Sequence, residues 1–252
     1  ADADRALEAA DEGAPVFPDP WLSQVSAMQT SRISELRAAR DLLRDGQVEA
    51  ALPRLESLSE REPDDFRVFE SLGVAYGELG RLSDAIRAFE RVLEINPAHA
   101  NGYENLARAL MKRSDDESAD EDAKSRDLET GLAHIEQALR LEPRKASAHG
   151  LKGDLHRRRG ELTDAGDAYA SAADLDPRAV HYSAAAASAY LRAEAWQPAV
   201  GILRPLADSH ATDDAGVWHS LAVAYIGLGE LDAADEALTE AERLAVDDAT
   251  FA

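Results

Sequence analysis

The stretch of sequence that decides the fold runs from Phe66 to Pro97 and reads FRVFESLGVAYGELGRLSDAIRAFERVLEINP. Residues three and four apart lie on the same side of a helix, so apolar residues at that spacing predict an amphipathic helix. The first half of the stretch carries such a face, made of Phe69, Leu72, Gly73 and Tyr76. The second half carries another, made of Ala85, Phe89 and Val92. Because Gly80 separates the two faces and Pro97 ends the second, the stretch predicts one antiparallel helix pair.

The same pattern recurs along most of the chain. Its units begin at Arg32, Phe66, Ala100, Ala146, Val180 and Ala215. An aromatic residue, Leu, Gly and Tyr, followed by Ala, an aromatic residue and Pro over about 34 residues, resembles the pattern of the tetratricopeptide repeat (TPR) family. The resemblance implies an all-α fold, a right-handed superhelical α-solenoid of antiparallel helix pairs with the first helix of each pair on the concave side. We therefore predict a solenoid of six repeats over residues 32–252.

Residues 1–31 are predicted to form an N-terminal extended segment and a capping helix. Pro15, Pro18 and Pro20 favour an extended path, and Asp19 is a typical N-cap for a helix that begins at Pro20. That helix has one apolar face, made of Trp21, Val25 and Met28. We expect this face to cover the exposed edge of the first repeat. The alternative is a tethered pseudo-ligand that occupies the concave groove.

An acidic insertion interrupts the third repeat near residues 114–127. Six acidic residues lie between Asp115 and Asp122, and their mutual repulsion predicts a solvated loop with a helical extension at either edge. A calcium loop is disfavoured because the alternating acids, the central Gly and the closing Glu are missing. We also expect Pro53 and Pro205 to bend the second helices of the first and fifth repeats.

The composition excludes several classes of partner and chemistry. The chain of 252 residues has a formal net charge of −22, which disfavours binding to nucleic acid or to an anionic membrane surface. No apolar run is long enough to span a membrane, so we predict no membrane insertion. The absence of Cys excludes disulfides and thiolate metal sites, and it does not decide between a cytoplasmic and a periplasmic or exported protein. The acidic, Arg-over-Lys composition is typical of a bacterial source adapted to salt or rich in GC, with compositional drift as the alternative.

The concave groove is where a TPR array is expected to bind its partner. If the family geometry holds, thirty positions face this groove, and eight of them are basic while four are acidic. A relatively basic channel inside an acidic chain predicts binding of a protein or peptide that carries carboxylates. The alternative is that these cations neutralise acids on adjacent helices. The candidate groove residues are Arg40, Arg44, Arg67, Val74, Arg108, Met111, Lys112, Arg157, Arg158, Leu191, Arg192 and His219.

The clamp that TPR adaptors use for the C-terminal carboxylate of chaperones is not predicted here. The family pattern needs Lys, Asn, Asn, Lys and Arg on three successive first helices. The matching positions hold Leu36, Arg40, Ser71, Asn101 and Asn105. A frame shifted by one repeat holds Glu70, Val74, Asn105, Ser147 and Leu151. Because neither frame reproduces the clamp, we expect no binding of chaperone tails.

We expect neither catalysis nor a cofactor. The sequence contains no nucleophile elbow, no phosphate-binding Gly loop and no HExxH motif. His149 and His156, with Asp154, are the best metal candidates, but two turns of helix separate the two His by about 10 Å. Glu70 and Glu104 are interpreted as solvated groove charges rather than as an acid and base pair. The sequence thus predicts a non-catalytic interaction scaffold, or alternatively the TPR portion of a larger exported or enzyme-linked protein.

Overall fold

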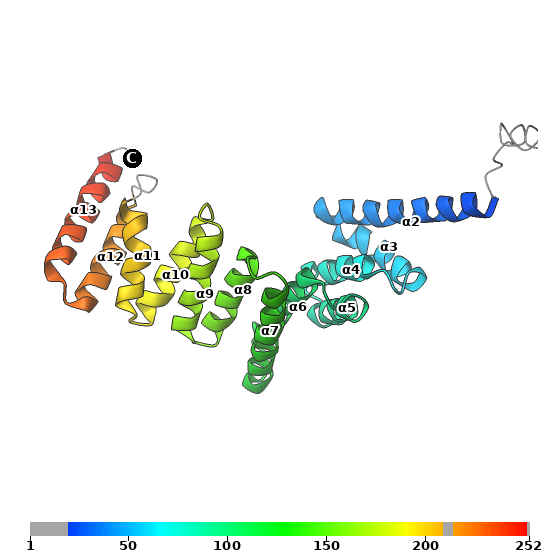
Figure 1. Ribbon diagram of the computed structural model, residues 1–252, viewed down its shortest axis with the longest axis horizontal. Coiled ribbons are helices and arrows are strands. Elements are labelled where there is room, and N and C mark those ends of the chain that lie inside the picture. The colour runs from blue at the N-terminus through cyan, green and yellow to red at the C-terminus, as the bar shows by residue number, and fades with distance from the viewer. Residues whose placement is uncertain (1–19, 209–213, 251–252) are drawn as a thin grey trace, which may run out of the picture. The chain divides into compact units, whose positions relative to one another are not determined.

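The computed structural model describes residues 20–208 and 214–250, and the side chains of residues 32–208 and 214–245. All regular secondary structure of these residues is helical (Figure 1). The helices are α2 (Pro20–Arg44), α3 (Val48–Arg61), α4 (Phe66–Glu78), α5 (Leu82–Ile95), α6 (Ala100–Ser114), α7 (Glu121–Leu141), α8 (Ala146–Arg158), α9 (Leu162–Leu175), α10 (Val180–Arg192), α11 (Trp196–Asp208), α12 (Ala215–Leu228) and α13 (Leu231–Thr250). The all-α prediction is confirmed, and α4, α6, α8, α10 and α12 begin at the residues that the repeat pattern indicated.

The N-terminal unit, residues 1–63, contains α2 and α3. Helix α2 begins at Pro20, as expected, and runs through the boundary that we placed between residues 31 and 32. Ala39, Ala51 and Leu55 are fully buried between α2 and α3. The predictions for residues 1–19, and the capping role of Trp21, Val25 and Met28, lie outside the residues whose side chains the structure describes.

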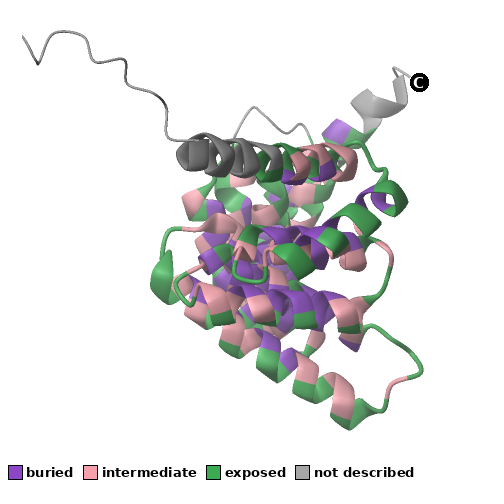
Figure 2. Cartoon of the chain, turned by 90° about the vertical axis from the view of Figure 1, so that its right-hand side faces the viewer, coloured by how far each residue is buried: buried purple, intermediate pink, exposed green. Residues whose placement is uncertain are grey.

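The C-terminal unit, residues 64–252, has a core that is divided between neighbouring helices. One cluster joins α5 to α6, a second joins α6, α7 and α8, and a third joins α9 through α13. Buried residues lie on the inward sides of the helices and exposed residues at the turns and outer sides (Figure 2). Each helix pair therefore packs both within itself and against its neighbours, as expected for an array of repeats.

The acidic insertion is mostly helical. Only Asp115–Asp120 separate α6 from α7, and α7 is lengthened at its N-terminus so that it projects beyond α8 and α9 (Figure 1). Asp120 is the N-cap of α7, and its carboxylate accepts a hydrogen bond from the backbone N–H of Ala123 at 2.6 Å. Acids in the first turn of a helix interact favourably with its dipole. The structure thus has the short loop with a helical extension that the sequence predicted, and the extension lies at the N-terminal edge of α7.

The turns between the two helices of most pairs contain a glycine. Gly46, Gly80, Gly160 and Gly229 have φ angles of 73° to 77°, the left-handed region in which glycine is favoured. The corresponding turn between α10 and α11 has Glu194 with a φ angle of 55°. Helices α3 and α11 continue through Pro53 and Pro205 without interruption, while the expected bends stay predictions.

Replacement of Glu194 by glycine should stabilise the protein by about 1 kcal/mol, because the left-handed conformation costs an L-residue roughly that amount. The midpoint of urea unfolding, followed by far-UV circular dichroism, measures the change. Glu194→Ala is the control, since it removes the same side chain and keeps the strained backbone, and it should give no gain. Equal stabilities of the two variants would contradict the strain at this turn.

Candidate binding cleft

Five of the predicted groove residues line one cleft of about 560 Å³ in the C-terminal unit. They are Arg108, Met111, Lys112, Arg157 and Arg192. The walls come from α6, α8 and α10, with one residue from α9, and we name this surface the α6–α10 cleft. First helices of three successive pairs therefore supply most of the lining, as the family geometry implies. The position of these residues follows from the repeat spacing, which puts them on equivalent faces of their helices.

The α6–α10 cleft is rich in positive charge. Arg108, Lys112, Arg157 and Arg192 line it together with a single carboxylate, that of Asp154. Two of the cations have acidic partners. Arg108 donates to Glu104 at 2.7 Å, and Arg157 lies 3.4 Å from Asp154. Lys112 and Arg192 are exposed, and among the described residues no carboxylate lies within ion-pair distance of either.

Two tyrosines, Tyr169 and Tyr182, also line this cleft, and the sequence analysis did not assign them to it. The hydroxyl of Tyr169 donates to Asp154 at 2.7 Å, and Arg157 donates to that hydroxyl at 3.3 Å. Burial, together with the hydrogen bond to Asp154, raises the pKa of Tyr169 to about 12. The ring of Tyr182 lies against Gly150, where an added Cβ would come within 2.4 Å of it. A small residue in one first helix opposite an aromatic residue in the next was the signal that could have indicated Tyr182.

Glu104 is buried, which corrects its interpretation as a solvated groove charge. Its exposed fraction is 6%, and it accepts hydrogen bonds from Arg108, from Ser147 at 3.1 Å and from Lys145 at 2.9 Å. Burial would raise the pKa of the Glu104 carboxyl, but the hydrogen bond and charge of Lys145, helped by Arg108, hold that pKa below its ordinary value. Lys145 precedes α8, so the contact joins two successive repeats across the insertion. Glu70, the other acid, is half-buried and lies 2.8 Å from His99.

The remaining candidates lie outside this cleft. In the N-terminal unit Arg40 and Arg44 are exposed, and Arg44 is paired with Asp41 at 2.7 Å. Arg67 binds the N-cap Asp65, and Val74 packs on the cluster between α5 and α6.

Two further candidates lie near the insertion and on α12. Arg158 makes two hydrogen bonds with Asp115 of the insertion, at 2.8 and 3.0 Å, and holds the pKa of that carboxyl below its ordinary value. His219 is exposed on α12. Neutralisation by neighbouring acids therefore accounts for Arg44, Arg67, Arg108, Arg157 and Arg158, and it leaves Lys112 and Arg192 unexplained.

A second cleft, of about 520 Å³, lies between α10, α11 and α12, and we name it the α10–α12 cleft. Leu191, the last candidate, lines it. Most of the other lining side chains are aliphatic or small, namely Val180, Ala184, Ala187, Leu203, Leu206, Gly216 and Val217. Ser188 and Arg192 of α10 line both clefts, so the two are neighbours on one surface.

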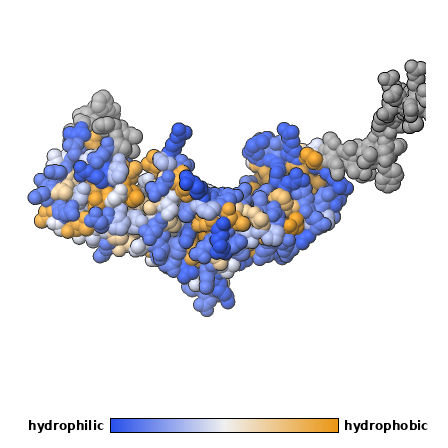
Figure 3. Space-filling view, in the orientation of Figure 1, coloured by the Kyte–Doolittle hydropathy of each residue, from blue (hydrophilic) through white to orange (hydrophobic). Residues whose placement is uncertain are grey.

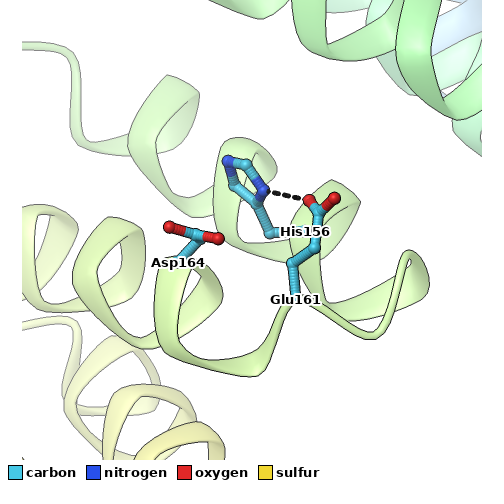
Figure 4. A group of neighbouring side chains, drawn as sticks. All are labelled: His156, Glu161 and Asp164. Carbon is cyan, nitrogen blue, oxygen red and sulfur yellow. Dashed lines mark hydrogen bonds and ion pairs between the residues drawn. The ribbon is translucent and has the colours of Figure 1, made fainter.

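The three metal candidates of the sequence analysis are not brought together. His149 contacts the carbonyl of Pro143 at 3.0 Å, and Asp154 contacts Tyr169. His156 instead lies with Glu161 and Asp164 at the turn between α8 and α9 (Figure 4), where one potential ligand atom from each residue lies within 4.8 Å of the others. The signal in the sequence was the spacing of three potential ligands, since Glu161 follows His156 by five positions across the turn at Gly160 and Asp164 follows Glu161 by three.

The contacts of Glu161 favour a structural role for this group. His156 Nδ1 lies 2.7 Å from Glu161 Oε2, and Arg159 donates to Glu161 at 2.9 Å. The two bonds hold the pKa of the Glu161 carboxyl below its ordinary value. Because a guanidinium already neutralises this carboxylate, the group stabilises the turn and we do not assign it to a metal.

Comparison with known proteins identifies the family. The sequence profile of the tetratricopeptide repeat matches residues 36–100, 71–120, 117–180 and 215–247. A comparison with curated proteins found no match.

Several solved structures share the fold of this chain. The thermophilic TPR protein TTC0263 of Thermus thermophilus is 22% identical, with a TM-score of 0.57 over 77% of this chain and 99% of that one. PilF of Pseudomonas aeruginosa is 14% identical, with a TM-score of 0.60 over 86% and 92% of the two chains. PilW, described as a type IV pilus biogenesis factor, is 17% identical, with a TM-score of 0.59 over 82% and 90%. The helix pairs, their spacing and the profile matches lead to one conclusion: this chain belongs to the tetratricopeptide repeat family.

Proposed function

We propose that the chain is a non-catalytic scaffold and that its α6–α10 cleft binds a protein segment carrying carboxylates. Proteins of this family bind other proteins, and the family is generally non-catalytic. No described helix has the combination of length and apolar character that crossing a bilayer requires. Membership of the family does not specify the class of partner or the place where it binds, and our proposal adds both.

One observation carries the proposal. Lys112 and Arg192 present their charges to the same cleft without ion-pair partners among the described residues, in a chain whose formal net charge is −22. An acidic chain has many carboxylates available for neutralising its cations, so two unpaired cations in one concave surface are the feature that a ligand would complete. Arg108 is paired with Glu104, and Arg157 is paired with Asp154. Each Arg side chain is still 44% exposed, so a ligand can reach it.

The overall negative charge does not prevent this binding. At physiological salt the Debye length is about 8 Å, so distant surface acids are largely screened from a ligand in the cleft. Charges that line the cleft act at close range and in a lower dielectric, where they are screened much less. Local charge therefore decides which segment binds, and the net charge mainly slows the approach of an acidic partner.

Charge reversal of both cations tests the proposal. The probe is a fluorescein-labelled decapeptide of Glu, Gly and Ser, and its affinity is measured by fluorescence anisotropy. Lys112→Glu with Arg192→Glu should weaken binding at least about tenfold, since each replaced contact is worth roughly 1 kcal/mol. A peptide with Gln in place of Glu should bind weakly to every variant.

Arg126→Glu with Arg178→Glu is the matched control. Both residues are exposed and outside the cleft, and the change in net charge is the same. This control should keep the affinity of the unmodified protein within about twofold. An equal loss in both double variants would show a long-range effect of charge, and it would refute binding in the α6–α10 cleft.

A further inference from the structure

We infer that the ligand of this scaffold is bipartite, with carboxylates in the α6–α10 cleft and aliphatic side chains in the α10–α12 cleft. This inference rests on the proposed function and adds a second recognition element to it. The two clefts share Ser188 and Arg192, so one continuous segment can enter both. A binding surface that changes from basic to apolar over one helix selects a ligand with the matching change.

The α10–α12 cleft has the chemistry of a site for aliphatic side chains. Leu191, Leu203, Leu206 and Val217 line it, and Val180 at its edge is 49% exposed. Its single carboxylate belongs to Asp214, which accepts a hydrogen bond from the backbone N–H of Gly216 at 2.8 Å as the N-cap of α12. Because that acid is committed to the helix, the cleft offers mainly apolar surface to a ligand.

Helix α12 continues this apolar surface. Its sequence, AGVWHSLAVAYIGL, contains no Asp, Glu, Lys or Arg, and Val223 and Ile226 are 37% and 53% exposed. Helices α6 and α8 carry charged residues in the equivalent turns, so the change toward apolar character occurs at α10. Figure 3 shows apolar residues among hydrophilic ones over the C-terminal helices. Exposed apolar surface next to a polar site is typical of an interaction surface.

The charge of the neighbouring cleft decides between occupants. A second copy of this acidic chain would bring many carboxylates within close range over a whole interface, where salt screens them less, and only Arg192 of the α10–α12 cleft would oppose them. A short segment with a few carboxylates and aliphatic residues at its other end matches both clefts without that repulsion. The occupant to which we commit is therefore an amphipathic segment of another protein.

Four labelled peptides separate the two parts of the site. The first has the acidic sequence used above. Two more join the same acids to two leucines, with the leucines at the N-terminal end in one and at the C-terminal end in the other. The last has the leucines without acids. The acidic and aliphatic peptide, in its better order, should bind about tenfold more tightly than the acidic peptide, because two buried leucines contribute more than their ordering costs.

Val180→Asn should remove at least half of this gain in binding free energy and leave the acidic peptide unaffected. Val180 is 49% exposed at the first position of α10, so a polar side chain there stays solvated and the fold should be kept. Leu231→Asn is the matched control, since Leu231 is also an exposed aliphatic residue at the first position of a helix, outside both clefts. Circular dichroism and sedimentation velocity check the helical content and the association state of each variant.

The outcomes are distinct for the two proposals. If the acidic peptide binds and the added leucines give no gain, or a gain that Val180→Asn leaves intact, the bipartite ligand is refuted and the proposed function stands. If the acidic peptide fails to bind at all, both are refuted. Self-association that Val180→Asn abolishes would assign the apolar cleft to a second copy and would also refute the inference.

Discussion

Replacement of Gly73 by alanine should destabilise the C-terminal unit by about 1–3 kcal/mol, even though alanine is the better helix former. Gly73 lies in the middle of α4, and a Cβ built on it would come within 2.4 Å of the ring of Phe89 on α5. Phe89 is itself 4% exposed and packs in the cluster with Leu106 and Leu110. Because the ring is buried among these side chains, we expect the added methyl group to displace the ring or to separate α4 from α5.

Gly77→Ala in the same helix is the matched control. No atom lies within 4 Å of the position that its Cβ would take, so this variant should gain about 0.5–1 kcal/mol from helix propensity alone. The midpoints of urea unfolding should therefore move in opposite directions for the two variants. A Gly73→Ala protein as stable as Gly77→Ala would show that the close approach of the two helices is not what requires glycine.

The same packing explains why the fold could be predicted from sequence. A small residue at position 73, a small residue at position 85 and mostly large apolar residues between them recur because each helix pair must bury the same face against its neighbour. These requirements are local to about two repeats, so a pattern in the sequence is enough to place the first helices, and α6 and α10 begin at the predicted residues. The right-handed superhelix is not a local property and stays a prediction.

The insertion shows where local reasoning was incomplete. Repulsion among the acids between Asp115 and Asp122 predicted a solvated loop with helical extensions, but it did not indicate which acids would have partners. Asp120 caps α7, and Arg113 makes two hydrogen bonds with Asp127 at 2.6 and 2.7 Å. The effect of a carboxylate depends on whether it meets another acid, a helix N-terminus or a guanidinium. That partner is set by the three-dimensional path of the chain, which the count of charges does not contain.

The sequence indicated which cations share one cleft, but it did not indicate which of them have acidic partners. Repeat spacing grouped Arg108, Lys112 and Arg192, and all three line the α6–α10 cleft, while their role in binding stays a prediction. It could not show that Arg158 would bind Asp115, because that contact joins residues 43 positions apart across an insertion of irregular length. Tyr182 was missed for a related reason, since its role depends on the space left by Gly150 in the preceding first helix.

Replacement of Glu104 by glutamine should cost about 1.5–3 kcal/mol at pH 7, because it removes the charge that Lys145 and Arg108 share and weakens the contact between two repeats. The cost should also depend on pH. The folded protein holds the pKa of Glu104 below its ordinary value of 4.5, so the stabilisation is present above that value and is lost as the pH falls through the folded pKa. Urea unfolding at pH 7 and at several pH values below 4.5 measures this difference.

The difference in unfolding free energy between the unmodified protein and Glu104→Gln separates the effect of Glu104 from that of the other acids. Protonation of many carboxylates weakens the unmodified protein and the variant alike, so the difference in unfolding free energy between them should shrink toward zero in acid. Glu129→Gln is the control, because Glu129 is exposed on α7, and it should change the stability by less than about 0.5 kcal/mol at either pH. If the loss of unfolding free energy in Glu104→Gln stays constant with pH, then packing, and not charge, holds α6 against Lys145. In that case Arg108 would also be positioned in the cleft by packing alone.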